Sequence, residues 1–178
     1  MAVIAPVGPD RTAVIPQEGQ RNYAEVGSLG LQLSRRLGLP VLAHEVSDSD
    51  VVLLHVFRQG KRVHRYVSDL GMLADPVETD EGMMFEVDGV RYSEEALPQG
   101  PVGDDPAAIE PFGVGTVDLR WLANALYGRE GEGTRIFAEQ LHMEIIEALN
   151  LKPDLLTRAF RHTDVSDLAN AELIDQAG

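Results

Sequence analysis

The chain has 178 residues, of which 44% are hydrophobic and 25% charged, and its formal net charge is −14 at pH 7. This length and composition are typical of one soluble globular domain with a sizeable core. The lack of cysteine excludes disulfides, thiolate metal sites and cysteine nucleophiles. The first residues do not have the pattern of a signal peptide, and no apolar run approaches about 18 residues. We therefore expect a cytoplasmic protein that does not enter a membrane.

The charge is distributed unevenly along the chain. Residues 1–75 carry eight basic and eight acidic residues, whereas residues 76–178 carry seven basic and 21 acidic ones. A surface this acidic repels phosphate backbones, so nucleic acid is not an expected partner. The acidic part either serves solubility or docks on a basic protein. The candidate docking residues surround the second predicted hairpin and are Glu78, Asp80, Glu81, Glu94 and Glu95.

The first part of the chain predicts an arm followed by a helix. Residues 1–22 are rich in Pro and Gly around an apolar patch at 12–15, which either adds an edge strand or stays loose. Apolar residues then recur at spacings of three and four, which predicts a helix from Tyr23 to Leu37, capped by Gly38. The residues of this apolar face are Val26, Leu29, Leu33 and Leu37.

Three β-favouring runs follow at 41–46, 51–57 and 62–67, and the last two read as a hairpin. The basic residues of this hairpin guard an edge strand, bind an anion, or pair with the acidic half of a second copy in a homo-oligomer. We favour the first of these roles. The four residues are Arg58, Lys61, Arg62 and Arg65.

The register of this hairpin depends on its turn. A two-residue turn at Gln59-Gly60, which we favour, sets Val56 against Val63 and His55 against His64. A type I turn with a bulge shifts the register by one residue and breaks both pairs.

A second hairpin is predicted around Asp88-Gly89, a dipeptide that suits a type I′ turn. The turn sets Glu86 against Arg91, which is an opposite-charge pair, and leaves one apolar face that we expect to be buried. The residues of that face are Phe85, Val87, Val90 and Tyr92.

Helices are predicted for the rest of the chain. A short turn at 106–109 comes first, and Thr116 then caps a helix that ends before Gly128. Thr134 caps the strongest helix, Pro153 opens another, and Asp164 caps a last one that reaches Ile174. The strongest helix has apolar residues at steps of four, which are Phe137, Leu141, Ile145 and Leu149.

Several short segments resemble a widespread but uncharacterised family of bacterial proteins over roughly residues 37–153. The resemblance implies an α+β fold and a bacterial cytoplasmic setting, and it implies no activity, cofactor or catalytic residue. The segments are the strand pair 51–67 around Gly60, GDDPAAI at 103–109, PFG at 111–113, FAxxxH at 137–142 and ALNLKP at 148–153.

The histidines are the main candidates for chemistry. In one register and one strand order, His44, His55 and His64 share a sheet face and could hold a zinc ion with an open position. No motif with reliable metal spacing is present, so we expect neither a metal nor another cofactor. His142 lies beside the apolar stripe of the strongest helix, where a hydrogen bond to a neighbour is its expected role. We assign no catalytic residue.

The sequence therefore predicts an α+β protein with one antiparallel sheet of about five strands, an N-terminal helix and three or four C-terminal helices. We expect an arm at 1–22, a single domain at 23–160 and an acidic helix or tail at 161–178. The preferred function is a non-catalytic binding or regulatory protein, such as an acidic inhibitor or immunity-like protein. The alternative is a small hydrolase or metal-dependent enzyme that uses the sheet histidines.

Overall fold

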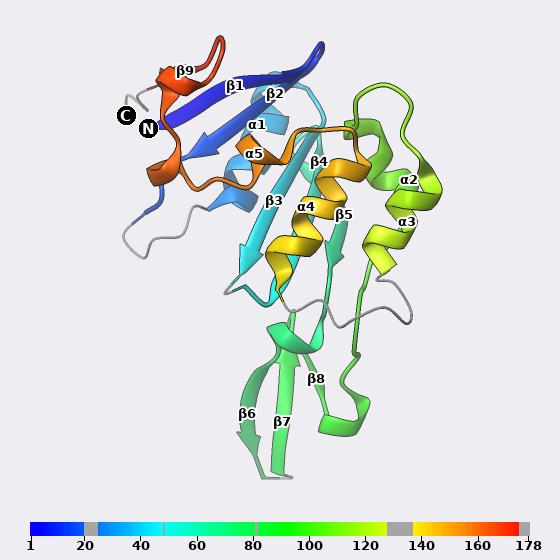
Figure 1. Cartoon of the computed structure of the whole chain (residues 1–178). Coiled ribbons are helices and arrows are strands. Elements are labelled where there is room, and N and C mark those ends of the chain that lie inside the picture. The colour runs from blue at the N-terminus through cyan, green and yellow to red at the C-terminus, as the bar shows by residue number, and fades with distance from the viewer. Residues whose placement is uncertain (20–24, 48, 81, 128–136, 175–178) are drawn as a thin grey trace.

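The computed structural model describes residues 1–19, 25–47, 49–80, 82–127 and 137–174. The α+β class is confirmed, but the strands form three separate three-stranded antiparallel sheets (Figure 1). The predicted single sheet of about five strands is wrong, because the two predicted hairpins belong to different sheets. Within the described ranges, none of the helices has the length and apolar character needed to cross a bilayer.

The elements follow one another in a mixed order along the chain. The strands are β1 (Ala2–Gly8), β2 (Arg11–Pro16), β3 (Val41–Ser47), β4 (Val51–Arg58), β5 (Lys61–Val67), β6 (Asp75–Thr79), β7 (Gly82–Val87), β8 (Val90–Tyr92) and β9 (Glu172–Ile174). The helices are α1 (Val26–Leu37), α2 (Pro106–Ile109), α3 (Leu119–Tyr127), α4 (Ala138–Ala148) and α5 (Pro153–Leu156).

The central sheet, in the order β3-β4-β5, carries the main core on one face. Val52, Leu54 and Tyr66 are fully buried there, beneath residues of α3 and α4. Helix α4 lies across this face in Figure 1. The opposite face is covered by α1 at one end and by Leu70 and Leu73 at the other.

Helix α1 packs most closely through small residues, while Val26, Leu29 and Leu33 of the predicted apolar face are only half-buried. Its buried residues are Gly30 and Ser34, whereas Leu37 is 60% exposed. A Cβ on Gly30 would lie 3.0 Å from the ring of Phe57, so the glycine allows the helix to approach β4 closely. Gly38 ends the helix in the left-handed conformation, as predicted.

The β4–β5 hairpin has the predicted two-residue turn, because Gln59 and Gly60 both have positive φ. A bulge on β5 follows the turn at once and shifts the register. The predicted pairs, Val56 with Val63 and His55 with His64, are therefore wrong. Val56 faces His64 and His55 faces Arg65 instead.

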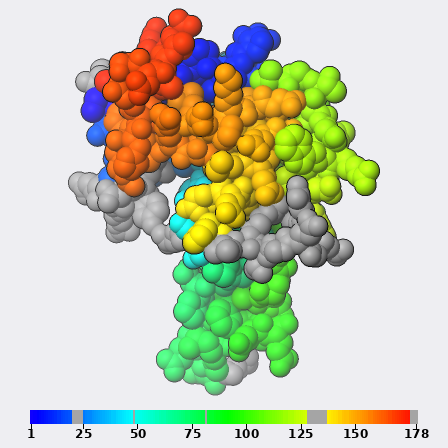
Figure 2. Space-filling model, in the orientation of Figure 1, coloured from blue at the N-terminus to red at the C-terminus, as the bar shows by residue number. Residues whose placement is uncertain are grey.

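The strands β6, β7 and β8 form a sheet that projects from the body of the molecule (Figures 1 and 2). We call Asp75–Ala96 the arm from here on; it is distinct from the N-terminal segment 1–22, whose residues form β1 and β2. Asp88 and Gly89 have φ of 52° and 78°, and the strand register matches the predicted one, with Glu86 facing Arg91. The prediction of a type I′ turn is therefore confirmed.

We expect Gly89→Val to lower the free energy of unfolding by about 1–3 kcal/mol, because a β-branched residue is strained at positive φ. A Cβ at Gly89 would meet no heavy atom within 4 Å, so the expected loss comes from the backbone conformation and not from a clash of the Cβ. Urea unfolding measures the change. Gly89→Asn is the matched control, since asparagine tolerates this conformation, and equal stability of Gly89→Val and the wild type would contradict the turn.

The third sheet has the order β2-β1-β9 and joins two distant parts of the sequence. The apolar patch at 12–15 thus belongs to a strand, β2. The predicted helix from Asp164 to Ile174 is wrong: Asp164 caps only the 3-10 turn Val165–Asp167, and Asn170 has a φ of 60° just before β9. The small core of this sheet consists of Val3, Ala5, Ala13, Ile15 and Leu155.

Helix α3 begins two residues later than predicted. The carboxylate of Asp118 accepts hydrogen bonds from the backbone N–H groups of Arg120 and Trp121, at 2.9 and 3.1 Å. Asp118 is therefore the capping residue and Thr116 is not. The predicted cap of the next helix, Thr134, lies outside the described residues.

Helix α4 supplies much of the main core. Its predicted stripe is buried at Leu141 and Ile145, and Leu149 just beyond its end is buried too, whereas Phe137 before its start is 53% exposed. Helix α5 opens at Pro153 as predicted. Helix α4 packs directly on β3 and β4, and α3 packs against α4 in the same core, so α4 determines the surroundings of His44.

Candidate functional site

The sheet histidines do not converge on one point. His44 faces Leu54 across the strands and His64 faces Val56, so both lie on the face covered by α4. His55 lies on the opposite face. The three imidazoles therefore cannot share one zinc ion. Among the residues that the structure describes, no three His, Asp or Glu side chains are grouped closely enough to hold a metal.

His44 and His142 form a buried pair between β3 and α4. The Nδ1 atom of His44 lies 3.1 Å from Nε2 of His142. Burial lowers the pKa of His44 to about 3, with a further contribution from His142. Burial also lowers the pKa of His142 to about 4, against an opposing effect of Glu139. Both rings are thus neutral near pH 7, and one donates an N–H to the other. The prediction of a hydrogen-bonded interface histidine at 142 is confirmed.

The four basic hairpin residues are divided between two faces. Arg58 and Lys61 pair across the turn on one face, while Arg62 and Arg65 lie on the other. Arg65 forms an ion pair with Asp88 at the β7–β8 turn, which ties the arm to the central sheet. The basic residues therefore do not form the single cluster that the sequence suggested.

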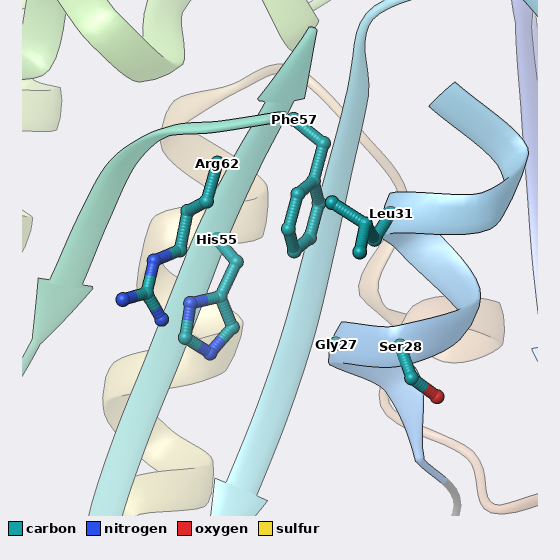
Figure 3. Close-up of a pocket in the computed structure, with 6 residues that line it drawn as sticks. All are labelled: Gly27, Ser28, Leu31, His55, Phe57 and Arg62. Carbon is teal, nitrogen blue, oxygen red and sulfur yellow. The ribbon is translucent and has the colours of Figure 1, made fainter. Parts of the chain in front are cut away.

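A pocket of about 390 Å³ opens where the first turn of α1 approaches β4 and β5 (Figure 3). In Figure 3 the guanidinium of Arg62 lies beside the ring of His55, and the ring of Phe57 lies beside Leu31. The sequence pointed to two of the lining residues for other roles: Arg62 as a basic residue of the hairpin and His55 as a candidate zinc ligand. The lining residues are Gly27, Ser28, Leu31, His55, Phe57 and Arg62.

His55 is the unusual polar group of this pocket. Its Nδ1 atom is buried and has no hydrogen-bond partner in the described part of the chain. Burial lowers the pKa of His55 to about 4, and the charges of Arg62 and Arg65 add to this effect, opposed by Asp88. The ring is therefore neutral near pH 7, with one nitrogen that lacks a partner.

The arm places the predicted acidic residues far from the central sheet. Glu78 and Asp80 lie around the β6–β7 turn at its far end (Figure 1), and Glu94 and Glu95 lie in the 3-10 turn after β8. Glu81 lies outside the described residues.

The apolar face of the arm is only partly covered. Val87 is 5% exposed, but Met83 and Val90 are 57% and 50% exposed. The expectation that this whole face is buried is thus wrong for Val90. No buried cluster of the described core lies within the arm, so its apolar side chains are left at the surface.

No family model, curated protein or solved structure matches the chain. The resemblance to a bacterial family therefore stays an expectation, and the arm and the pocket are the features of the described chain that bear on function.

Proposed function

We propose that the protein is a non-catalytic binding protein that docks its arm on a basic protein partner. The observation that carries this proposal is the concentration of charge on a projecting element. By sequence, the arm has eight acidic residues and a single basic one, Arg91, which amounts to half of the net charge of −14. A charged surface that stands clear of the body is accessible to a large partner and steers its approach.

Only some of the described carboxylates of the arm form ion pairs with basic residues of the described chain. Glu86 pairs with Arg91 at 2.9 Å, and Asp88 pairs with Arg65. The remaining described acids of the arm have no basic side chain within ion-pair distance among the described residues, and they are Asp75, Glu78, Asp80, Glu94 and Glu95. They are thus free to pair with cations of a partner.

Exposed apolar residues on the arm offer a partner apolar contacts in addition to the charged ones. Met83 faces Glu78 across the strands, so an apolar side chain and a carboxylate lie side by side near the far end of the arm. Interfaces commonly combine an apolar centre with a charged rim. This arrangement favours a partner with basic residues around an apolar patch.

The alternative enzyme function lacks a supporting observation in the described residues. The sheet histidines lie on two faces, and the one close pair, His44 with His142, is packed in the core. No nucleophile lies against that pair in the described hydrogen bonds.

The first test is a photo-crosslinking residue at Met83, compared with the same residue at the exposed Leu173 of the body, in cells that produce the protein. We expect a basic protein to be captured at 83 and not at 173. The captured protein is then purified for kinetic measurements. If the acidic residues serve only solubility, the two positions give the same background.

We expect the joint change of Glu78, Asp80, Glu94 and Glu95 to lysine to slow association with the purified partner by about tenfold or more, because surface charges act mainly in steering. Association of the wild type should also slow as ionic strength rises. The matched control reverses four exposed carboxylates of the body, Asp10, Glu147, Asp154 and Glu172. Salt-independent association, or an equal effect of the control, would contradict the proposal.

A further inference from the structure

The pocket beneath α1 has a free positive charge in its wall. Arg65 is neutralised by Asp88, but Arg62 has no ion pair or hydrogen bond to another described residue. Figure 3 shows its guanidinium lying along the pocket beside His55. A planar guanidinium in this situation is suited to hold a carboxylate through two parallel hydrogen bonds.

The first turn of α1 borders the pocket on the other side. The N-cap residue of this helix is Glu25, whose carboxylate lies at the helix start and offsets the partial positive charge there. The hydroxyl of Ser28 points away from His55 in Figure 3 and donates to Glu25, so it does not line the space beside Arg62. Arg62 is therefore the group that favours an anion in this pocket.

The ring of His55 lies beside the guanidinium of Arg62 in the wall of the pocket (Figure 3). Its unpartnered Nδ1 atom is buried, so a ligand in the pocket does not bond to it directly. The charged groups that act on His55 are Arg62, Arg65 and Asp88.

The remaining wall is apolar. The ring of Phe57 and the side chain of Leu31 line the pocket on the side of α1. A volume of about 390 Å³ is at the small end of the range for small-molecule sites. An inorganic anion would leave this wall in contact with water, whereas a ligand with an apolar body would cover it.

We infer that this pocket binds a small organic carboxylate with an apolar body. Arg62 holds the carboxylate, the ring of His55 lies beside it, and Phe57 and Leu31 receive the apolar part. The site is independent of the arm, and its occupation requires none of the contacts proposed for the protein partner.

The test is an NMR titration of isotope-labelled protein with three probes: benzoate, benzamide and inorganic phosphate. We expect benzoate to shift the signals of Arg62 Nε–H and the His55 ring with a Kd on the order of 1 mM. Benzamide has the same ring without the charge, and phosphate has charge without the ring, so both should bind about tenfold more weakly or worse. Bound benzoate should also raise the pKa of His55, because a nearby anion favours the imidazolium.

Three variants separate this site from general surface binding. Arg62→Gln should weaken benzoate binding about tenfold or more. A Cβ at Gly27 would meet no heavy atom within 4 Å, so Gly27→Leu should fill the pocket and abolish binding while the protein stays folded. Arg58→Gln, on the opposite face of the hairpin, should have no effect. No saturable shift with benzoate, equal binding of benzamide or phosphate, or full binding by Gly27→Leu would overturn the inference.

Discussion

Replacing Gly103 with alanine is expected to lower the free energy of unfolding by about 4 kcal/mol, the sum of backbone strain and steric overlap. Gly103 has a φ of 74°, which is unfavourable for alanine. The larger effect is steric: a Cβ there would lie 1.9 Å from the carbonyl oxygen of Arg65 and 3.0 Å from its carbonyl carbon. Backbone atoms cannot move aside as a flexible side chain can, so the two segments must separate.

Separation would break the contacts that hold this segment to β5. Val102 and Val67 exchange two backbone hydrogen bonds of 2.9 Å, and Nε2 of His64 donates to the carbonyl of Gly103 at 2.8 Å. Each such bond contributes about 1 kcal/mol to stability. Their loss accounts for most of the expected change beyond the strain of alanine itself.

Gly100→Ala is the matched control, measured by the same urea unfolding experiment. Gly100 has a φ of 80°, but a Cβ there would meet no heavy atom within 4 Å. This variant should therefore lose only about 1 kcal/mol, the penalty of the left-handed conformation. Equal losses for the two variants would show that Gly103 does not approach β5 closely.

Lowering the pH from 7 to 5 is expected to reduce the free energy of unfolding by about 4 kcal/mol through the pair of His44 and His142 alone. Their pKa values are about 3 and 4 in the folded protein, against 6.5 for an unperturbed histidine. Between pH 6.5 and these values the unfolded chain binds protons that the folded protein does not. The free energy of unfolding therefore decreases as the pH is lowered. Each histidine contributes about 2 kcal/mol over this interval.

The geometry of the pair explains why acid opposes folding. One proton lies between Nδ1 of His44 and Nε2 of His142 in the neutral pair, at 3.1 Å. A first added proton places a charge in the core, and a second sets two N–H donors against each other. His55, whose pKa is also lowered, adds an effect in the same direction.

Unfolding curves of a double variant, His44→Leu with His142→Leu, measure this contribution. Replacing both partners by apolar groups removes the titration without leaving one polar group unpaired. Between pH 7 and 5 the double variant should lose about 4 kcal/mol less stability than the wild type. The exposed His162, changed to glutamine, serves as the control and should keep the wild-type dependence. An unchanged dependence in the double variant would contradict the buried pair.

Local features of the fold could be predicted from the sequence because a few neighbouring residues determine them. Asp88-Gly89 specifies its turn through positive φ, and Gly38 and Pro153 mark the end and the start of helices. The number of sheets depends on which strand edges meet, and no local pattern encodes that. Thus the sequence of β9, a three-residue strand, predicts a helix instead, because the partner of this strand lies at the other end of the chain.

The candidate sites likewise divide into one that the sequence predicts and one that depends on contacts between distant residues. The acidic residues of the arm could be found by counting charges, since exposed charge is a property of composition. The pocket could not, because it depends on α1 packing through Gly30 and Ser34, which offer no apolar signal. Two glycines in a helical pattern, Gly27 and Gly30, were the available indication of a close approach. The bulge after the β4–β5 turn, which separates His55 from His64, had no signal in the sequence.

The pairing of β1 with β9 has a consequence for the order of assembly. Ala2–Ile4 pairs with Glu172–Ile174, so this contact closes a loop of nearly the whole chain. Contacts this distant form slowly, because the entropy of loop closure is lost before the contact is made. During synthesis the edge of β1 that pairs with β9 therefore stays unpaired until β9 has left the ribosome. The central sheet, made of consecutive strands, can form long before, and the third sheet completes the fold around it.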